Sequence, residues 1–431
     1  MTLDCGAMRR NQKERGATRM HFGWWVVATT FMAQLFMIGL YTYAWSLLAP
    51  EVAKEFGADM LTMNLVMSGA GLMGLALPPF VGVLVDRWSA RWLMVIGATS
   101  LLLALLGMSV ASSITIFVVV AALFMGVAAV LLGPITGSAV ITRWFTEKRG
   151  RALGISAIGT SAGGILLPQV MGWGFDAVGW RQTLQLIALG VAFVVIPMLL
   201  FLFRDHPDSS PDATGDSEVT ASRTDAKDAE HGDGVAGSLA EILRRGDFWV
   251  LTISLAFFIM CYTSTLANIG AFFDAELGLE ASQTGNWMSL LAFFGFLGKL
   301  FVGELIDRIS LRLVMWAGIG ATILGLGILS SEPSGPLLWV VAIALGLATG
   351  GILPVWNAMV AAVFGVAKFG RVMGLMGPAI GLVVTPGFTV AGAIRESTGS
   401  YVAVFQLFMA VLVGSSLLLG LLRIPASEAE S

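Results

Sequence analysis

The stretch Leu297-Gly-Lys-Leu-Phe-Val-Gly-Glu-Leu-Ile-Asp-Arg-Ile-Ser-Leu-Arg312 decides the fold of this chain. Its first part is an apolar run that contains one charged side chain, Lys299. Its second part, from Gly303 onward, is a Gly-x-x-x-Asp-Arg-x-x-x-Arg cluster. An apolar run that ends in a charged cluster indicates a membrane span that reaches the water interface.

The overall composition is that of a membrane protein. Of the 431 residues, 56% are hydrophobic and only 12% are charged, whereas soluble domains carry about 25% charged residues. The two cysteines, Cys5 and Cys261, have no metal-ligand neighbours, and no nucleotide-binding loop or catalytic triad is recognisable. We therefore expect no enzymatic activity, no metal, no cofactor and no nucleic-acid partner.

Twelve apolar runs have about the 20 residues that a helix needs to cross a bilayer. The sequence therefore predicts an all-α integral membrane protein with twelve transmembrane helices. The runs are centred in 22–48, 60–84, 92–111, 113–141, 151–174, 182–203, 248–273, 284–306, 312–330, 336–363, 371–394 and 401–423.

The distribution of Lys and Arg predicts the orientation. With a cytoplasmic N-terminus, the basic residues fall on the cytoplasmic side except Lys54, Arg181 and Arg395 on the outside and Lys299 inside a span. Because cytoplasmic loops are enriched in Lys and Arg, we expect both termini to be cytoplasmic. The expected location is the plasma (inner) membrane.

The chain is an internal repeat. The segment Gly82-Val-Leu-Val-Asp-Arg-Trp-Ser-Ala-Arg91 has a near copy at 303–312. Residues 204–246 contain almost no large apolar side chains and predict a flexible linker. The sequence therefore predicts two pseudo-symmetric six-helix bundles. The expected parts are a cytoplasmic tail at 1–21, a bundle at 22–203, the linker at 204–246, a bundle at 247–423 and a second tail at 424–431.

The repeated cluster resembles the cytoplasmic signature of the major facilitator superfamily, and the resemblance extends over essentially the whole spanning region. A narrower resemblance rests on Phe22-Gly-Trp-Trp-Val-Val-Ala28, on the segment from Arg143 to Gly164, and on Gly298-Lys-Leu-Phe-Val-Gly303. These segments are similar to the monocarboxylate-transporter family and its bacterial relatives. The resemblance implies the major facilitator fold and transport of small carboxylates, with a proton or in exchange.

Lys299 is the main candidate for substrate binding. An ionisable residue inside a membrane is costly and is a functional hypothesis by default. In the resembling family this place typically holds an arginine that pairs with the substrate carboxylate, and Lys299 would supply a point charge instead. The alternative is that Lys299 extends toward the interface or braces neighbouring helices.

A carboxylate proton carrier is missing from the spans. The resembling family often has an acidic or amide side chain one turn before the cation, where this chain has Gly295. Three possibilities therefore stay open: Lys299 itself cycles a proton, the protein exchanges anions, or it works as a uniporter.

Other polar side chains at the depth of the spans are weaker candidates. Each could form a hydrogen bond with the substrate or serve as a contact between helices, worth about 0.6 kcal/mol on average. Two of them, Tyr262 and Asn268, are favoured because the seventh span, here 248–273, lines the cavity in the resembling fold. The full set is Gln34, Thr160, Ser161, Tyr262, Asn268 and Thr349.

The repeated charged cluster predicts a conformational gate. Its acid can pair with basic residues of a neighbouring loop, and breaking such pairs biases one state of a transporter over another. The alternative is a simple topology anchor. The expected gate residues are Asp86, Arg87, Arg91, Asp307, Arg308 and Arg312.

Glycine pairs spaced by four residues predict close approach between helices. They are Gly159 with Gly163, Gly370 with Gly374, and Gly377 with Gly381.

The sequence favours a secondary active transporter of a small organic anion, a monocarboxylate, that works by alternating access as a proton symporter or an anion exchanger. We expect it to function as a monomer in the lipid bilayer. One alternative is a major-facilitator exporter or importer of larger amphiphilic compounds. An alternative of another class is a non-transporting membrane sensor.

Overall fold

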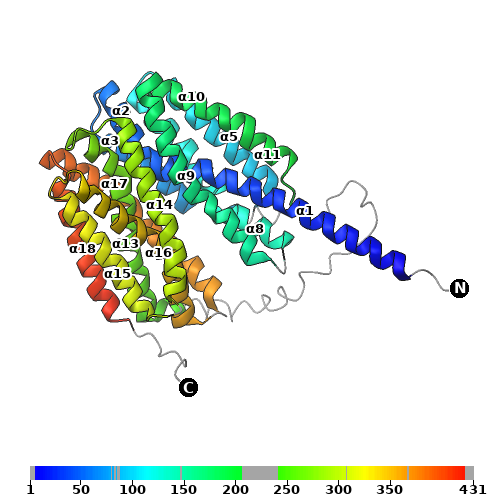
Figure 1. The fold of residues 1–431 in the computed structure, drawn as a ribbon. Helices are drawn as coiled ribbons and strands as arrows, with labels where there is room; N and C mark the ends of the chain where they lie inside the picture. The colour runs from blue at the N-terminus through cyan, green and yellow to red at the C-terminus, as the bar shows by residue number, and fades with distance from the viewer. Residues whose placement is uncertain are drawn as a thin grey trace. The chain divides into compact units, whose positions relative to one another are not determined.

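The computed structural model describes residues 5–78, 80–81, 84, 88–145, 148–205, 241–306, 308–365 and 368–422, with side chains from residue 22 onward. Every regular element in these ranges is a helix (Figure 1). The elements, with η for a π-helix, are α1 (Cys5–Ile38), η1 (Gly39–Ala44), α2 (Trp45–Phe56), α3 (Met60–Ala76), α5 (Ala90–Ser109), α6 (Ile114–Val120), η2 (Ala121–Met125), α7 (Gly126–Leu131), α8 (Pro134–Trp144), α9 (Arg149–Val178), α10 (Trp180–Gly190), η3 (Val191–Val195), α11 (Ile196–Phe201), α13 (Gly246–Ala275), α14 (Ala281–Ile306), α15 (Leu311–Leu329), α16 (Pro336–Phe364), α17 (Phe369–Thr398) and α18 (Val402–Gly420).

The predicted all-α membrane fold is confirmed. Within the described ranges, 11 helical segments are long and apolar enough to cross a bilayer. Helix α3 is apolar but only 17 residues long, and it covers the first part of the predicted span 60–84. Only helices can cross a bilayer as separate segments, because each backbone N–H and C=O must be satisfied within its own segment.

The first span is longer than predicted. It runs from Phe22 to Phe56, whereas the apolar run ends at residue 48. The helix ends at Gly57, which adopts a left-handed conformation with φ of 62°. Glu51 and Lys54 form an ion pair at spacing i,i+3 within this last part, so the charged residues continue the helix instead of ending it.

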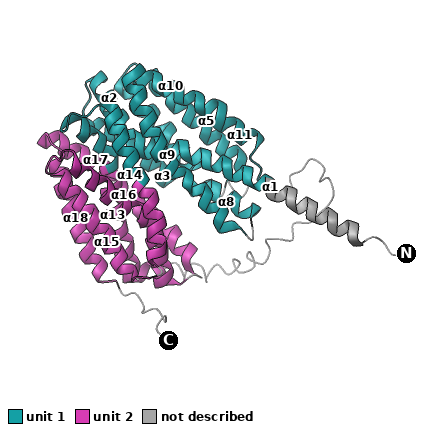
Figure 2. Ribbon diagram, viewed as in Figure 1, with its two compact units in different colours: residues 1–210, 266–293 teal, residues 211–265, 294–431 magenta. Residues whose placement is uncertain are grey.

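The described helices fall into two compact units (Figure 2). Unit 1 comprises Met1–Ser210 and Leu266–Phe293, and unit 2 comprises Pro211–Thr265 and Phe294–Ser431. The end of α13 and the beginning of α14 therefore cluster with the first part of the chain. The predicted division at 204–246 stays a prediction, because residues 206–240 lie outside the described ranges.

In unit 1, α1 and α9 touch through their backbones. A Cβ at Gly159 would clash with the carbonyl oxygen of Phe31, and a Cβ at Gly163 would clash with that of Leu35. A Cβ at Gly39 would lie 2.6 Å from the Gly163 oxygen. The close approach predicted for the pair Gly159 and Gly163 is confirmed.

The end of α13 and the start of α14 pack within unit 1 in the same way. A Cβ at Gly285 of α14 would lie 2.5 Å from the carbonyl oxygen of Pro168 in α9. A Cβ at Gly172 of α9 would lie 2.6 Å from the oxygen of Ala281 at the start of α14. Backbone contact of this kind explains why residues 266–293 belong to unit 1.

In unit 2, α14 and α16 are in equally close contact. A Cβ at Gly298 would lie 2.5 Å from the oxygen of Leu347, and a Cβ at Gly351 would lie 2.6 Å from Val302. Gly350 of α16 faces the backbone of α14 at Gly295.

The close approach predicted for Gly370 and Gly374 of α17 is wrong, and so is that predicted for Gly377. A Cβ at Gly370, Gly374 or Gly377 would meet no atom within 4 Å. A spacing of four residues between glycines permits two helices to approach closely, but it does not supply a partner helix. At these three glycines the space beside α17 is open.

We predict that Gly163→Ala destabilises the protein by about 1–3 kcal/mol, because the new methyl group has no room beside the Leu35 carbonyl. The matched control is Gly154→Ala on the same helix, where a Cβ meets no atom within 4 Å. Thermal unfolding of both detergent-solubilised variants measures the difference. Equal midpoints for the two variants would contradict the packing argument.

Candidate functional site

Lys299 lies in α14 as its only charged side chain between Ala281 and Gly303. The side chain is half-buried. Its backbone is fixed by the contact with α16, because a Cβ at Gly350 would lie 2.9 Å from the Lys299 nitrogen. The cation is therefore held on one of the most closely packed parts of unit 2.

The face of α14 on which Lys299 lies can be traced along the helix. Ala292 packs against α9, where a Cβ at Gly164 would lie 2.8 Å from the Ala292 methyl group. Lys299 follows seven residues later, about 10 Å further along the same face. By this helical spacing Lys299 lies on the same side of α14 as Ala292.

Position 295, one turn before Lys299, is a place of helix contact. Gly295 is buried, and its carbonyl oxygen lies where a side chain at Gly350 would have to be. The position at which the resembling family often has an acidic or amide side chain is therefore, in this chain, a point of backbone contact between α14 and α16.

Asn268 forms a buried amide pair with a residue that the sequence analysis did not single out. Asn64 Nδ2 in α3 donates to Asn268 Oδ1 at 2.9 Å, and Asn268 Nδ2 donates back to Asn64 Oδ1 at 3.2 Å. Both side chains are only 1% exposed. The pair joins α3 to α13 within unit 1.

Gln34 belongs to a hydrogen-bonded chain between α1 and α9. Gln34 Nε2 donates to Ser156 Oγ at 2.9 Å, and Ser156 Oγ donates to Thr30 Oγ1 at 2.9 Å. Thr30 in turn donates to the Val27 oxygen at 2.9 Å. This geometry is that of a contact between helices; the substrate role of Gln34 stays a prediction.

The remaining polar candidates lie on three helices, α9, α13 and α16. Thr160 Oγ1 donates to the Ala157 oxygen and Thr349 Oγ1 to the Gly346 oxygen, each at 2.8 Å within its own helix. Ser161 is buried in α9, and Tyr262 is half-buried in α13. Of the predicted set, Tyr262, Thr349 and Lys299 belong to unit 2, and the others belong to unit 1.

Arg91 and Arg312, the last residues of the two repeated clusters, each donate to a backbone oxygen near the end of a helix. Arg91 Nη2 donates to the Leu200 oxygen in the last turn of α11, and Arg312 Nη2 donates to the Leu422 oxygen just beyond α18. A cation at a helix C-terminus is stabilised by the helix dipole. Each arginine of the repeat thus fixes the last helix of its own half of the sequence.

The rest of the predicted gate is only partly described. Arg308 pairs with Glu304 at 2.6 Å, with exposed fractions of 72% and 66% for the two side chains. Asp86, Arg87 and Asp307 lie outside the described residues. The gate therefore stays a prediction.

Arg181 is a structural residue that the sequence analysis missed. Its guanidinium binds the Glu55 carboxylate at 2.7 Å and donates to the oxygens of Ser109 and Ala111 at 2.8 and 2.9 Å. Trp180 Nε1 also donates to Glu55, at 2.6 Å. These bonds join α2, α10 and the end of α5. One signal in the sequence could have pointed to Arg181: it is one of only three basic residues that the sequence analysis places on the outside.

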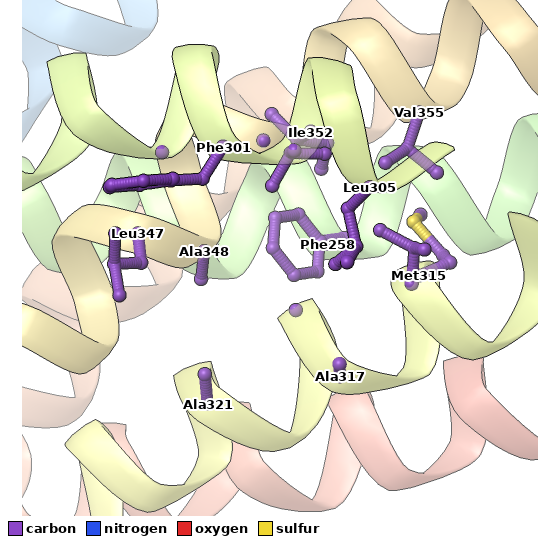
Figure 3. A pocket seen from close by; sticks show the side chains of 15 residues that line it. Phe258, Phe301, Leu305, Met315, Ala317, Ala321, Leu347, Ala348, Ile352 and Val355 are labelled. Carbon is purple, nitrogen blue, oxygen red and sulfur yellow. The ribbon is translucent and has the colours of Figure 1, made fainter. Parts of the chain in front are cut away.

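Lys299 does not line the apolar cavity that lies beside α14. A cavity of 360 Å³ in unit 2 lies beside α14 and has an apolar lining (Figure 3). Among the described residues, no three His, Cys, Asp or Glu side chains gather where they could hold a metal ion. The expectation that no metal or cofactor takes part stays a prediction.

A multi-pass chain whose described elements are all helices, with a cation inside one span, has the architecture of a membrane transporter. The model of the Major Facilitator Superfamily matches residues 30–278 and 262–431. The chain belongs to this superfamily.

Relatives point in two directions. Monocarboxylate transporter 11 of Homo sapiens is 24% identical over 93% of this chain and 83% of its own length. The Fujikurins efflux protein of Gibberella fujikuroi is 25% identical over 86% of this chain and 75% of its own length. Among solved structures, the nucleoside transporter NupG has a TM-score of 0.71 at 16% identity, over 92% of this chain and 99% of that one. The structural likeness shows the fold alone.

We predict that Asn64→Leu or Asn268→Leu alone destabilises the protein by about 1–3 kcal/mol, because each removes one side of a buried amide pair. The double variant should cost less than the sum of the single variants. Thermal unfolding of the four proteins in detergent measures this coupling.

An exposed amide pair provides the control. Gln169 Nε2 donates to Asn286 Oδ1 at 3.3 Å between α9 and α14. Replacing either residue by leucine should change stability by no more than about 0.5 kcal/mol. Strictly additive losses at Asn64 and Asn268 would show that the buried pair is not energetically coupled.

Proposed function

We propose that this chain is a secondary active transporter of a small organic anion, a monocarboxylate, across the plasma (inner) membrane with both termini cytoplasmic. The observation that carries the proposal is Lys299, the single charged side chain within α14 before its end. The similarity to monocarboxylate transporter 11 supports the substrate class. We expect no enzymatic activity.

Lys299 supplies the charge that a carboxylate needs inside a membrane. A carboxylate that leaves water loses its hydration, and an ammonium at contact distance offsets that loss. Lysine binds as a point charge without the bidentate geometry of arginine, so the site tolerates carboxylates in several orientations. The polar side chains of Tyr262 and Thr349 in the same unit are the proposed hydrogen-bonding partners.

Alternating access requires contacts that break and re-form. The proposed contacts on the outer side are the Asn64 and Asn268 amide pair and the ion pair of Lys54 with Asp274 at 2.6 Å. Both join helices from the first half of the sequence to α13. On the cytoplasmic side, the proposed gate comprises Asp86, Arg87, Arg91, Asp307, Arg308 and Arg312.

The second candidate is transport of larger amphiphilic compounds. The similarity to the Fujikurins efflux protein and the apolar cavity beside α14 favour it. Uptake into proteoliposomes of labelled lactate, pyruvate and longer carboxylates, beside an amphiphilic dye, distinguishes the two. Movement of neither class would favour the non-transporting sensor.

We predict that Lys299→Ala lowers carboxylate uptake at low substrate concentration by at least about thirtyfold, since loss of one partner of a buried charge pair costs about 2 kcal/mol or more. Lys299→Arg should retain part of the activity. The control is Lys368→Ala, which removes a cation whose exposed side chain pairs with Glu241 at 3.1 Å. Full uptake by Lys299→Ala would refute the anion site.

A separate experiment tests whether substrate uptake is coupled to a proton gradient or to exchange with internal substrate. Because α14 carries Gly295 where the resembling family often has an acidic or amide side chain, we predict anion exchange: substrate trapped inside the liposomes should accelerate uptake. A pH gradient alone should have little effect on the rate. Uptake that follows the pH gradient and ignores internal substrate would establish proton symport instead.

A further inference from the structure

The apolar cavity of unit 2 is a groove lined by four helices. It lies between Phe258 of α13, the segment 298–305 of α14, the segment 314–321 of α15 and the segment 347–355 of α16. Figure 3 shows side chains made of carbon, apart from the sulfur of Met315. Its volume of 360 Å³ is within the range of about 300–1,000 Å³ that ligand sites occupy.

This groove is not suited to an anion. Gly298, Phe301 and Leu305 recur along α14 at spacings of three and four residues and so form one helix face, while Lys299 is not part of the lining. A carboxylate in the groove would lose its hydration and gain no hydrogen bond. The occupant must therefore be largely apolar in the part that enters.

The groove reaches the surface of unit 2 at Phe301. This lining side chain is 61% exposed. In a chain that spans a bilayer, such a surface is in contact with lipid hydrocarbon. An apolar cavity of this kind does not hold water.

One end of the groove lies at the turn between α14 and α15. The Leu305 oxygen accepts from the backbone N–H of Arg308 at 3.1 Å, so the lining leads directly into the charged turn. From Leu305 back to Gly298 the groove extends about 10 Å along α14. That length is about two thirds of one leaflet of a hydrocarbon core of about 30 Å.

Arg308 lies three residues beyond Leu305, in the turn at this end of the groove. Its side chain is 72% exposed and pairs with Glu304 on one side. A guanidinium presents five N–H donors in a planar fork, so it can bind a phosphate and keep the Glu304 carboxylate. A basic residue at the membrane interface attracts phospholipid headgroups.

We propose that the groove binds one acyl chain of a membrane glycerophospholipid whose phosphate lies at Arg308. The proposal is independent of the transported substrate. It places a lipid against α14, the helix that carries Lys299, and it makes that lipid a part of the packing of α14 with α15 and α16.

The test is photolabelling of the full-length protein in liposomes. The probe is a phosphatidylglycerol with a diazirine at the end of one acyl chain, and labelled peptides are identified by mass spectrometry. We expect labels on the groove segments of α14, α15 and α16. A second probe, a fatty alcohol with the same diazirine, lacks the phosphate and should label them less.

Two glycines of α15 provide a matched pair of variants. A Cβ at Gly318 or at Gly320 meets no atom within 4 Å, but only Gly318 lines the groove. Gly318→Leu fills the groove and should lower its labelling about tenfold, the effect of excluding roughly two methylene groups. Gly320→Leu should leave the labelling unchanged. Ala321→Phe fills the groove independently, in case Gly318→Leu does not fold.

The headgroup contact has its own variant. Arg308→Gln should lower labelling by the phosphatidylglycerol probe about fivefold and leave labelling by the fatty alcohol unchanged. Undiminished labelling of the groove in a folded Gly318→Leu or Ala321→Phe variant would overturn the proposal. Equal labelling by both probes in the unmodified protein would overturn the phospholipid as occupant.

Discussion

Close backbone contact at glycines is the interaction on which this fold depends. Lipid tails are as apolar as leucine, so helices in a membrane associate through close packing and hydrogen bonds rather than through the hydrophobic effect. Gly163 against Leu35 serves this purpose in unit 1, and Gly350 against Gly295 does so in unit 2. The second contact also fixes the backbone of Lys299. One packing constraint thus stabilises unit 2 and positions its half-buried cation.

The sequence predicted the helices well because the bilayer leaves the backbone so few alternatives. It did not predict their ends: the charges of Glu51 and Lys54 suggest a loop, but the helix continues to Phe56. The π-helices η1, η2 and η3 have no distinct apolar pattern and were not foreseen. The glycine spacing in α17 suggested a partner helix that the open space at Gly374 shows to be absent there.

The candidate site was predictable only where one residue stands out chemically. A lysine inside an apolar run is visible in the sequence, so Lys299 could be found. The partner of Asn268 could not, because Asn64 is 204 positions away and looks like any polar residue of a span. The carbonyls that Arg91 and Arg312 contact have no sequence signature at all, since every residue has a backbone oxygen.

The contacts of α13 within unit 1 differ in how they respond to ionic strength. Lys54 is 56% exposed, so salt in the surrounding solution screens its attraction to Asp274. The Asn64 and Asn268 pair is buried and uncharged, and screening does not act on it. This end of α13 is therefore held by an ion pair that salt weakens and by an amide pair that salt does not weaken, so it stays attached over a wide range of ionic strength.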